Sequence, residues 1–192
     1  LVCCRADDSE LCLEMLREPY HLTEEQMHQA AERYRLGKSR SGKTIYWMID
    51  EMGICHDGHV GCDSYGAETW VSTMLKRRFP EVAKYIRPQH CLFGLHLLET
   101  LPEASVAIVE RERSAVILSE MRPECLWMAT AYPANFTMEQ LEPLQGHRVT
   151  LFPRTDPCLE TYLWWLNVAD MAQRRYQLEI TVSDILERCC SP

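Results

Sequence analysis

The second half of the chain alternates short apolar runs with amphipathic stretches, and this alternation is the feature that most restricts the fold. Runs rich in Val, Ile and Leu predict fully buried strands. Strands that alternate with helices are typical of a parallel sheet with right-handed crossovers, so the predicted fold class is α/β. The expected strands are 105–109, 125–129, 148–152 and 178–182, and the expected helices are 112–121, 137–144, 158–175 and a short one after Ser183.

The first half of the chain mixes helix and strand signals, which predicts a small α+β region. Thr23 and Gln26 form a capping-box pattern, so we expect a helix to begin there and to run to about Tyr34. Residues 44–50 and 54–62 are rich in β-formers on either side of a turn and predict a hairpin. The other expected features are helices over 7–17 and 70–79, a basic loop over 35–43 and an apolar segment over 90–98.

The overall charge restricts the class of partner. The 192 residues carry a formal charge of −8, with 12 Lys/Arg against 15 Asp/Glu in residues 1–100 and 8 against 13 in the remainder. Neither half is basic, which argues against strong non-specific binding to duplex DNA by phosphate neutralisation. A local basic groove stays compatible with these totals.

The cysteines and the apolar runs indicate the compartment. The ten cysteines are scattered, and we expect most of them to be reduced thiols in a cytoplasmic protein. No apolar run approaches the roughly 18 residues of a membrane span, so no membrane association is expected. Because the chain begins with Leu1 rather than Met, we expect it to be part of a longer protein.

Carboxylates follow two of the predicted parallel strands. Glu110 comes directly after the strand 105–109, and Asp156 follows the strand 148–152. The carboxyl ends of parallel strands form the rim at which α/β sheets bind ligands, and converging carboxylates suit Mg²⁺ or Mn²⁺. A second explanation is that Glu110 and Glu112 begin the next helix and oppose its dipole. Arg154 stands where a second aspartate is expected.

Three further motifs allow functional interpretations, but simpler explanations are favoured. Residues 55–62 contain two Cys and two His, yet alternate residues of a hairpin point to opposite faces and converge poorly on zinc. Residues 39–44 resemble the end of a phosphate loop, but they lack its first glycine and precede a strand. Trp164 and Trp165 could stack on bases, whereas packing of their helix against the sheet is the favoured role.

Several segments together resemble a known family, the toprim domain shared by bacterial primases, topoisomerases and related nucleases. The similar segments are residues 106–110, 127–130 and 149–152, in this order and at this spacing. Upstream, residues 45–50 resemble the strand and turn of the primase catalytic core that precedes toprim, and residues 91–98 resemble the segment that enters it. Over residues 22–190, the closest resemblance is to uncharacterised toprim-containing proteins of Bacteroides-type mobile elements.

The resemblance implies a set of site residues. In the toprim family, a glutamate after the first strand and an Asp-x-Asp pair after the third strand ligate Mg²⁺. Glu110 matches the glutamate, to which an acid/base role is also assigned, and Asp156 matches the second aspartate. Arg154 occupies the position of the first aspartate, where a cation at ~4 Å disfavours a divalent ion by roughly a few kcal/mol at an effective dielectric constant of 20.

Two classes of function follow, on an expected division into a region 1–102 and a toprim-like domain 103–192. One is a primase-like, Mg²⁺- or Mn²⁺-dependent nucleotidyl or phosphoryl transferase in DNA replication or mobile-element maintenance. The other is a catalytically degenerate module that binds single-stranded nucleic acid, a nucleotide or a replication protein. In the second class, Arg111, Arg113 and Arg154 would bind phosphate, because guanidinium forks match phosphate oxygens. A purely structural role also stays open.

Overall fold

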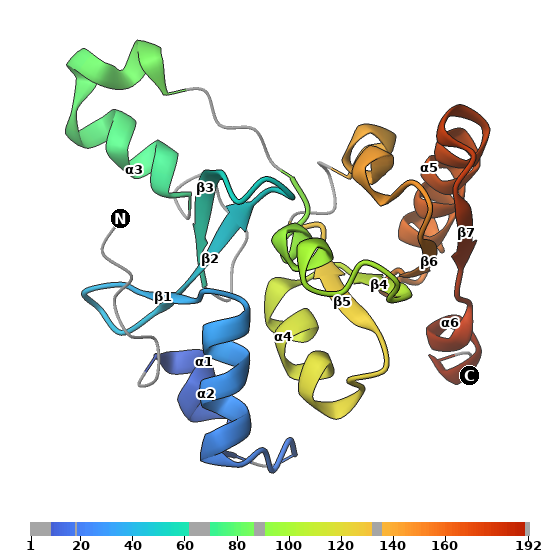
Figure 1. The fold of residues 1–192 in the computed structure, drawn as a ribbon, viewed down its shortest axis with the longest axis horizontal. Helices are drawn as coiled ribbons and strands as arrows, with labels where there is room; N and C mark the ends of the chain where they lie inside the picture. Colours follow the sequence, from blue (N-terminus) through green and yellow to red (C-terminus); the bar gives the residue numbers. More distant parts are fainter. Residues whose placement is uncertain (1–8, 18, 62–69, 87–90, 132–135, 191–192) are drawn as a thin grey trace. The chain divides into compact units, whose positions relative to one another are not determined.

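A computed structural model describes residues 9–17, 19–61, 70–86, 91–131 and 136–190. The chain divides into two compact units, Leu1–Leu97 and Leu98–Pro192, and each is described by itself below (Figure 1). The boundary expected after residue 102 stays a prediction. Within the described residues, no helix combines the length and the apolar character that crossing a bilayer requires.

The first unit contains a three-stranded antiparallel sheet in the order β1-β2-β3 (Figure 1). β2 (Thr44–Ile49) and β3 (Cys55–Val60) form the predicted hairpin, with a register shift at Met48 and Ile49. The loop expected over 35–43 is wrong in part, because β1 (Gly37–Lys38) pairs with the start of β2. A strand of two residues is too short to show the period-2 pattern on which prediction depends.

The first two helices of the first unit each begin with a capping side chain. α1 (Glu10–Met15) is capped by Ser9, and α2 (Glu24–Arg33) begins with the predicted capping box of Thr23 and Gln26. The core of this unit includes three packed rings: Phe93 stacks on Tyr34 at 5.1 Å between centroids and meets the Tyr46 ring edge-on at 5.5 Å. The remaining helices of this unit are α3 (Val71–Arg78) and the 3₁₀ helix η2 (Pro80–Tyr85). A second 3₁₀ helix, η3 (Leu95–Glu99), contains the boundary between the two units.

The second unit contains a four-stranded, all-parallel sheet in the order β5-β4-β6-β7 (Figure 1). This confirms the predicted α/β class. All side chains of β4 and β5 are buried, as their uniformly apolar sequences require. The strands are β4 (Val106–Val109), β5 (Leu126–Ala129), β6 (Arg148–Phe152) and β7 (Glu179–Val182), and the helices are α4 (Glu112–Met121), η5 (Met138–Leu144), α5 (Glu160–Tyr176) and α6 (Ile185–Cys190).

Two helical segments differ in part from what the sequence predicts. Trp165 is fully buried and its ring lies 4.7 Å from that of Phe136, so the expected core role holds for Trp165, whereas Trp164 is 47% exposed. The helix expected over 137–144 is a 3₁₀ helix rather than an α-helix. Pro143 lies within it, and a proline cannot donate the backbone hydrogen bond that an α-helical interior needs.

Candidate functional site

The parallel sheet brings the residues after β4 and β6 to one edge. Val109 and Phe152, the last residues of these strands, are directly paired in register. Glu110 follows immediately, and its side chain is only 6% exposed. The backbone at this point is held by Thr130, whose N–H donates to the Val109 carbonyl at 3.1 Å and whose hydroxyl donates to the Glu110 carbonyl at 3.3 Å. The carboxyl edge therefore holds Glu110 in a fixed, nearly buried place.

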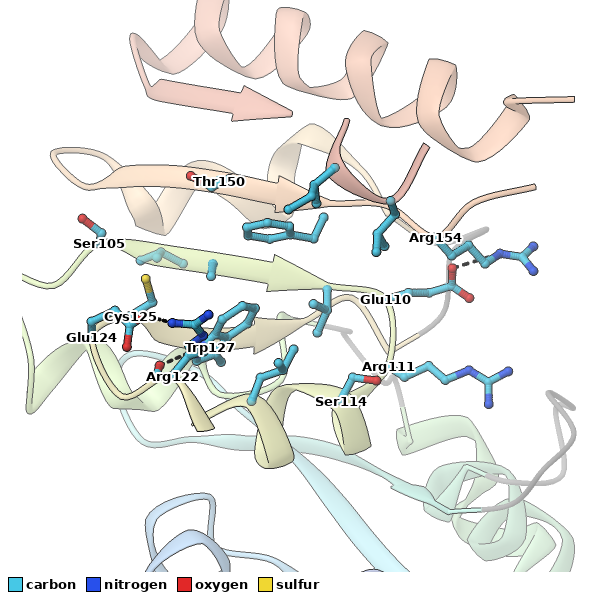
Figure 2. A pocket seen from close by; sticks show the side chains of 17 residues that line it. Ser105, Glu110, Arg111, Ser114, Arg122, Glu124, Cys125, Trp127, Thr150 and Arg154 are labelled. Carbon is cyan, nitrogen blue, oxygen red and sulfur yellow. Dashed lines mark hydrogen bonds and ion pairs between the residues drawn. The ribbon is translucent and has the colours of Figure 1, made fainter. Parts of the chain in front are cut away.

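The guanidinium of Arg154 forms an ion pair with the carboxylate of Glu110. Nε of Arg154 lies 3.0 Å from Oε2 of Glu110, and Figure 2 shows the two side chains meeting at the arrowhead ends of the strands. The Arg154 side chain remains 61% exposed. A buried carboxylate with a guanidinium beside it is charge-balanced, and the balancing group still reaches solvent.

The carboxylate of Asp156 accepts hydrogen bonds from the backbone at the start of the next helix, α5. Its Oδ1 accepts hydrogen bonds from the N–H groups of Cys158 (3.1 Å) and Glu160 (2.9 Å), and its Oδ2 accepts one from Thr161 (2.9 Å). These bonds, led by that from the Thr161 N–H, lower the pKa of Asp156 to about 2. Asp156 therefore satisfies N–H groups at the start of α5, which the chain pattern alone did not indicate.

The donor set at this edge does not fit a divalent cation as it stands. Glu110 faces Arg154, and both oxygens of Asp156 accept backbone hydrogen bonds. Across the part of the chain that the structure describes, no three His, Cys, Asp or Glu side chains gather as a metal site would require. A Mg²⁺ or Mn²⁺ role for Glu110 and Asp156 stays a prediction.

The other two expected cations occupy different positions on α4. Arg111 is the N-cap residue of α4 and is exposed, and Figure 2 shows it on the same side of the sheet edge as Arg154. Arg113 is half-buried within the first turn of the helix. Glu112 begins α4 and is 3% exposed, which agrees with the helix-dipole explanation for this acid.

A groove of about 600 Å³ runs from this edge along one face of the sheet (Figure 2). Its floor includes Val109, Trp127 and Phe152, and its walls include Leu118 of α4 and Leu186 of α6. The volume is within the usual range for small-molecule pockets, which are mostly apolar with a few polar groups. Arg111, Glu110 and Arg154 lie at one end, whereas Arg122, Glu124 and Cys125 lie at the other.

The sequence pattern does not reveal this groove. Alternate residues of β4, β5 and β6 share one face of the sheet, so their period could have indicated a common surface. Because β4 and β5 are uniformly apolar, however, the sequence does not distinguish a covered face from an open one. The tilted contact between the Trp127 and Phe152 rings, 5.7 Å between centroids, shows how the floor is packed.

The candidate zinc motif of the hairpin does not form a cluster among its described residues. His56 Nε2 lies 2.7 Å from Oδ2 of Asp50, and Cys55 contacts the carbonyl of Asp57. The His59 ring lies 5.0 Å from the Trp70 ring. Cys62, the fourth member, lies outside the described residues. The residues of this motif thus have separate structural partners, in line with the favoured interpretation.

Comparison with solved structures defines the class of fold. A DnaG primase catalytic domain bound to single-stranded DNA aligns with a TM-score of 0.55 at 10% identity, covering 86% of this chain and 62% of that one. The catalytic core of the E. coli primase aligns with a TM-score of 0.43 at 9% identity, covering 81% and 51%. This chain therefore spans less than two thirds of either protein. At such identity the first similarity establishes the fold alone: this is a primase-like fold.

The sequence itself defines the family. Residues 12–155 match the family described as a domain of unknown function (DUF6371), which is most of the chain, so the chain belongs to that family. No curated protein matches it significantly. The resemblance to the primase catalytic core is confirmed at the level of the fold. The resemblance to mobile-element proteins and a role in replication stay predictions.

Proposed function

We propose that this protein is a primase-like module that binds single-stranded nucleic acid at the carboxyl edge of its parallel sheet without metal-dependent chemistry there. The observation that carries the proposal is the ion pair between Arg154 and Glu110. In this proposal, Arg154 takes the place of the cation that balances the glutamate, and its exposed part contacts phosphate together with Arg111 and Arg113.

The chemistry of the edge supports phosphate binding. A guanidinium presents several N–H donors in one plane, and this fork matches the oxygens of a phosphate. The Nε contact with nearly buried Glu110 restrains the Arg154 side chain, so less conformational freedom is lost when a ligand binds. Arg111 is exposed at the same edge, next to the first turn of α4.

Replication or mobile-element maintenance is the setting that the toprim resemblance suggests, and a nucleotide or a replication protein is the alternative partner. The primase catalytic domain to which the fold is similar was solved with single-stranded DNA bound. That ligand belongs to the other protein. It motivates the choice of single-stranded DNA as the first probe for this one.

The test is fluorescence anisotropy of a labelled oligo(dT) strand, titrated with the wild type and with Arg111→Gln, Arg154→Gln and Arg154→Lys variants over a salt series. Each Gln substitution should reduce the salt slope by about 0.7, because one phosphate contact is lost. Arg154→Lys should keep the slope and weaken binding, because the charge remains and the fork is lost.

Arg148→Gln is the matched control. Arg148 also pairs with a glutamate, Glu179, at 2.7 Å, but it lies at the opposite end of β6 and both side chains are about two-thirds exposed. Its substitution should leave binding unchanged. Absence of binding at low salt, or equal effects of the Arg148 and Arg154 substitutions, would contradict the proposed function.

A further inference from the structure

Residues 71–86 of the first unit form a helical segment, here called the basic arm, which comprises α3 and η2 (Figure 1). Its first turn is anchored to β3: the Ser72 hydroxyl donates to Oδ2 of buried Asp57 at 2.6 Å, and the Ser72 N–H donates to Oδ1 at 3.0 Å. The ring of Trp70, the N-cap residue, lies 5.0 Å from that of His59 of β3, with the two planes tilted by 35°. The arm therefore has a fixed base.

Beyond its base, the basic arm buries little. Ser72 is the only buried residue of α3, and η2 has none. Most of its large apolar side chains are exposed, including Phe79 at 40% and Tyr85 at 73%. Single exposed apolar residues are ordinary, but several on one helical segment mark a contact surface.

The charge of the basic arm is opposite to that of the chain. The arm contains four cations, Lys76, Arg77, Arg78 and Lys84, and one acid, Glu81, which gives +3 in a chain of −8. A basic patch on an acidic protein attracts polyanions locally, although the whole molecule does not. The net charge of the whole chain does not reveal this basic patch.

Each exposed ring of the basic arm has a cation beside it. The guanidinium carbon of Arg78 lies 5.6 Å from the centroid of the Phe79 ring, and Nζ of Lys84 lies 4.9 Å from that of Tyr85. A ring offers a face on which a base can stack, and an adjacent cation can reach the phosphate of the same nucleotide. This combination is how proteins bind single strands without reading sequence.

We propose that the basic arm is a second binding surface for single-stranded nucleic acid, with Phe79 and Tyr85 as stacking rings and Arg78 and Lys84 as phosphate contacts. This rests on the proposed function in taking the same class of ligand, but it uses residues of the other unit. The arm holds the strand by charge and stacking, so it tolerates any base sequence.

Two simpler explanations account for only part of these features. Cations in the last turn of α3 favourably oppose the helix dipole, but this explains neither Lys84 nor the exposed rings. A protein partner would cover the rings and the arginines, but interfaces are depleted of lysine, so it leaves Lys76 and Lys84 unexplained. A single strand explains the rings and the cations together.

The test measures binding of labelled oligo(dT) to the full chain over a salt series. The double variant Arg78→Gln/Lys84→Gln removes two exposed charges from the basic arm. It should weaken binding and reduce the salt slope by about 1.4, because two phosphate contacts are lost. The control, Arg174→Gln/Arg175→Gln, removes two exposed charges from the last turn of α5 and should behave as the wild type.

Stacking is tested separately from charge. Tyr85→Ala should weaken binding about tenfold and leave the salt slope unchanged, because it removes a ring but no cation. Tyr85→Phe should bind as the wild type, because the ring remains. All these side chains are exposed, so circular dichroism should show an unchanged fold.

The outcomes separate this inference from the proposed function. If the basic-arm variants bind as the α5 control does while Arg111→Gln weakens binding, the inference is wrong and the proposed function stands. If the basic-arm variants weaken binding and the edge variants do not, the inference stands and the proposed function is wrong. If the wild type does not bind oligo(dT) at low salt, both are wrong.

Discussion

Arg154 places its Nε 3.0 Å from Oε2 of Glu110, so the segment after β6 is joined to the end of β4 by an ion pair. In the toprim family, the residues that the resemblance matches with Glu110 and Arg154 are metal ligands. Here one of them is a cation, and the carboxylate is balanced from within the chain. That these positions correspond to a toprim site stays a prediction of the resemblance, and the ion pair is the observation that supports the proposed binding of an anion at this edge.

The first prediction concerns the stability of this pair. Arg154→Ala should lower the free energy of unfolding by about 1–2 kcal/mol, because it leaves nearly buried Glu110 without its cation. The figure is below that for a fully buried pair because Arg154 is largely exposed. Urea unfolding measures it, with Arg148→Ala as the control in an exposed pair. Equal losses for the two variants would mean that the Arg154 pair is an ordinary surface contact.

The second prediction concerns pH. The folded-state pKa of Asp156 is about 2, below the usual 3.8, so its contribution to stability is present above about pH 4 and is lost as the pH falls through about 2. Asp156→Asn should therefore reduce the pH dependence of unfolding in this window. Urea midpoints across these pH values measure the effect.

Asp170→Asn is the control for this pH experiment. Asp170 lies within α5 and pairs with Arg174 on the exposed side of the helix. Its substitution should leave the acid-dependent loss of stability in place. An Asp156→Asn variant that unfolds with the wild-type pH dependence would contradict the assigned hydrogen bonds.

The third prediction tests the base of the basic arm. Ser72→Ala should cost about 1–3 kcal/mol, because buried Asp57 loses the hydroxyl that donates to it at 2.6 Å. Thr73→Ala, one residue further along α3, is the comparison in chemical denaturation. Similar stabilities of the two variants would show that the arm is not anchored through this contact.

The fourth prediction uses two adjacent tryptophans. Trp165→Ala should cost about 3–5 kcal/mol, because it leaves a cavity beside Phe136, whereas Trp164→Ala should cost less than about 1 kcal/mol. Thermal or urea unfolding of both variants decides this. A larger loss of stability in Trp164→Ala than in Trp165→Ala would contradict the burial of Trp165 and the exposure of Trp164 on α5.

Much of the fold could be predicted because its signals are local. The bounds predicted for α4 and β6 match those of the structure, and the capping box at Thr23 fixes the start of α2. The sequence did not predict β1, because a strand of two residues is too short to show a periodic pattern. It did not predict η2 either, because this 3₁₀ helix begins at Pro80, directly after the end of α3.

The site was predicted less completely, because its chemistry depends on contacts between distant residues. Strand periodicity places Glu110 and the residues after β6 at one edge, and the structure brings Arg154 to Glu110 there. The sequence does not show that Asp156 turns toward the backbone of α5, since that depends on the path of the loop. The groove was missed because uniformly apolar strands do not reveal an open face.

The most direct test of the central claim is calorimetric titration of Mn²⁺ into the wild type, Arg154→Asp and Arg154→Asp/Glu110→Gln. We expect no saturable binding to the wild type, binding to Arg154→Asp because a cation has become a carboxylate ligand, and loss of that binding in the double variant. Submillimolar Mn²⁺ binding by the wild type, abolished by Glu110→Gln alone, would contradict the account and restore a metal-dependent site.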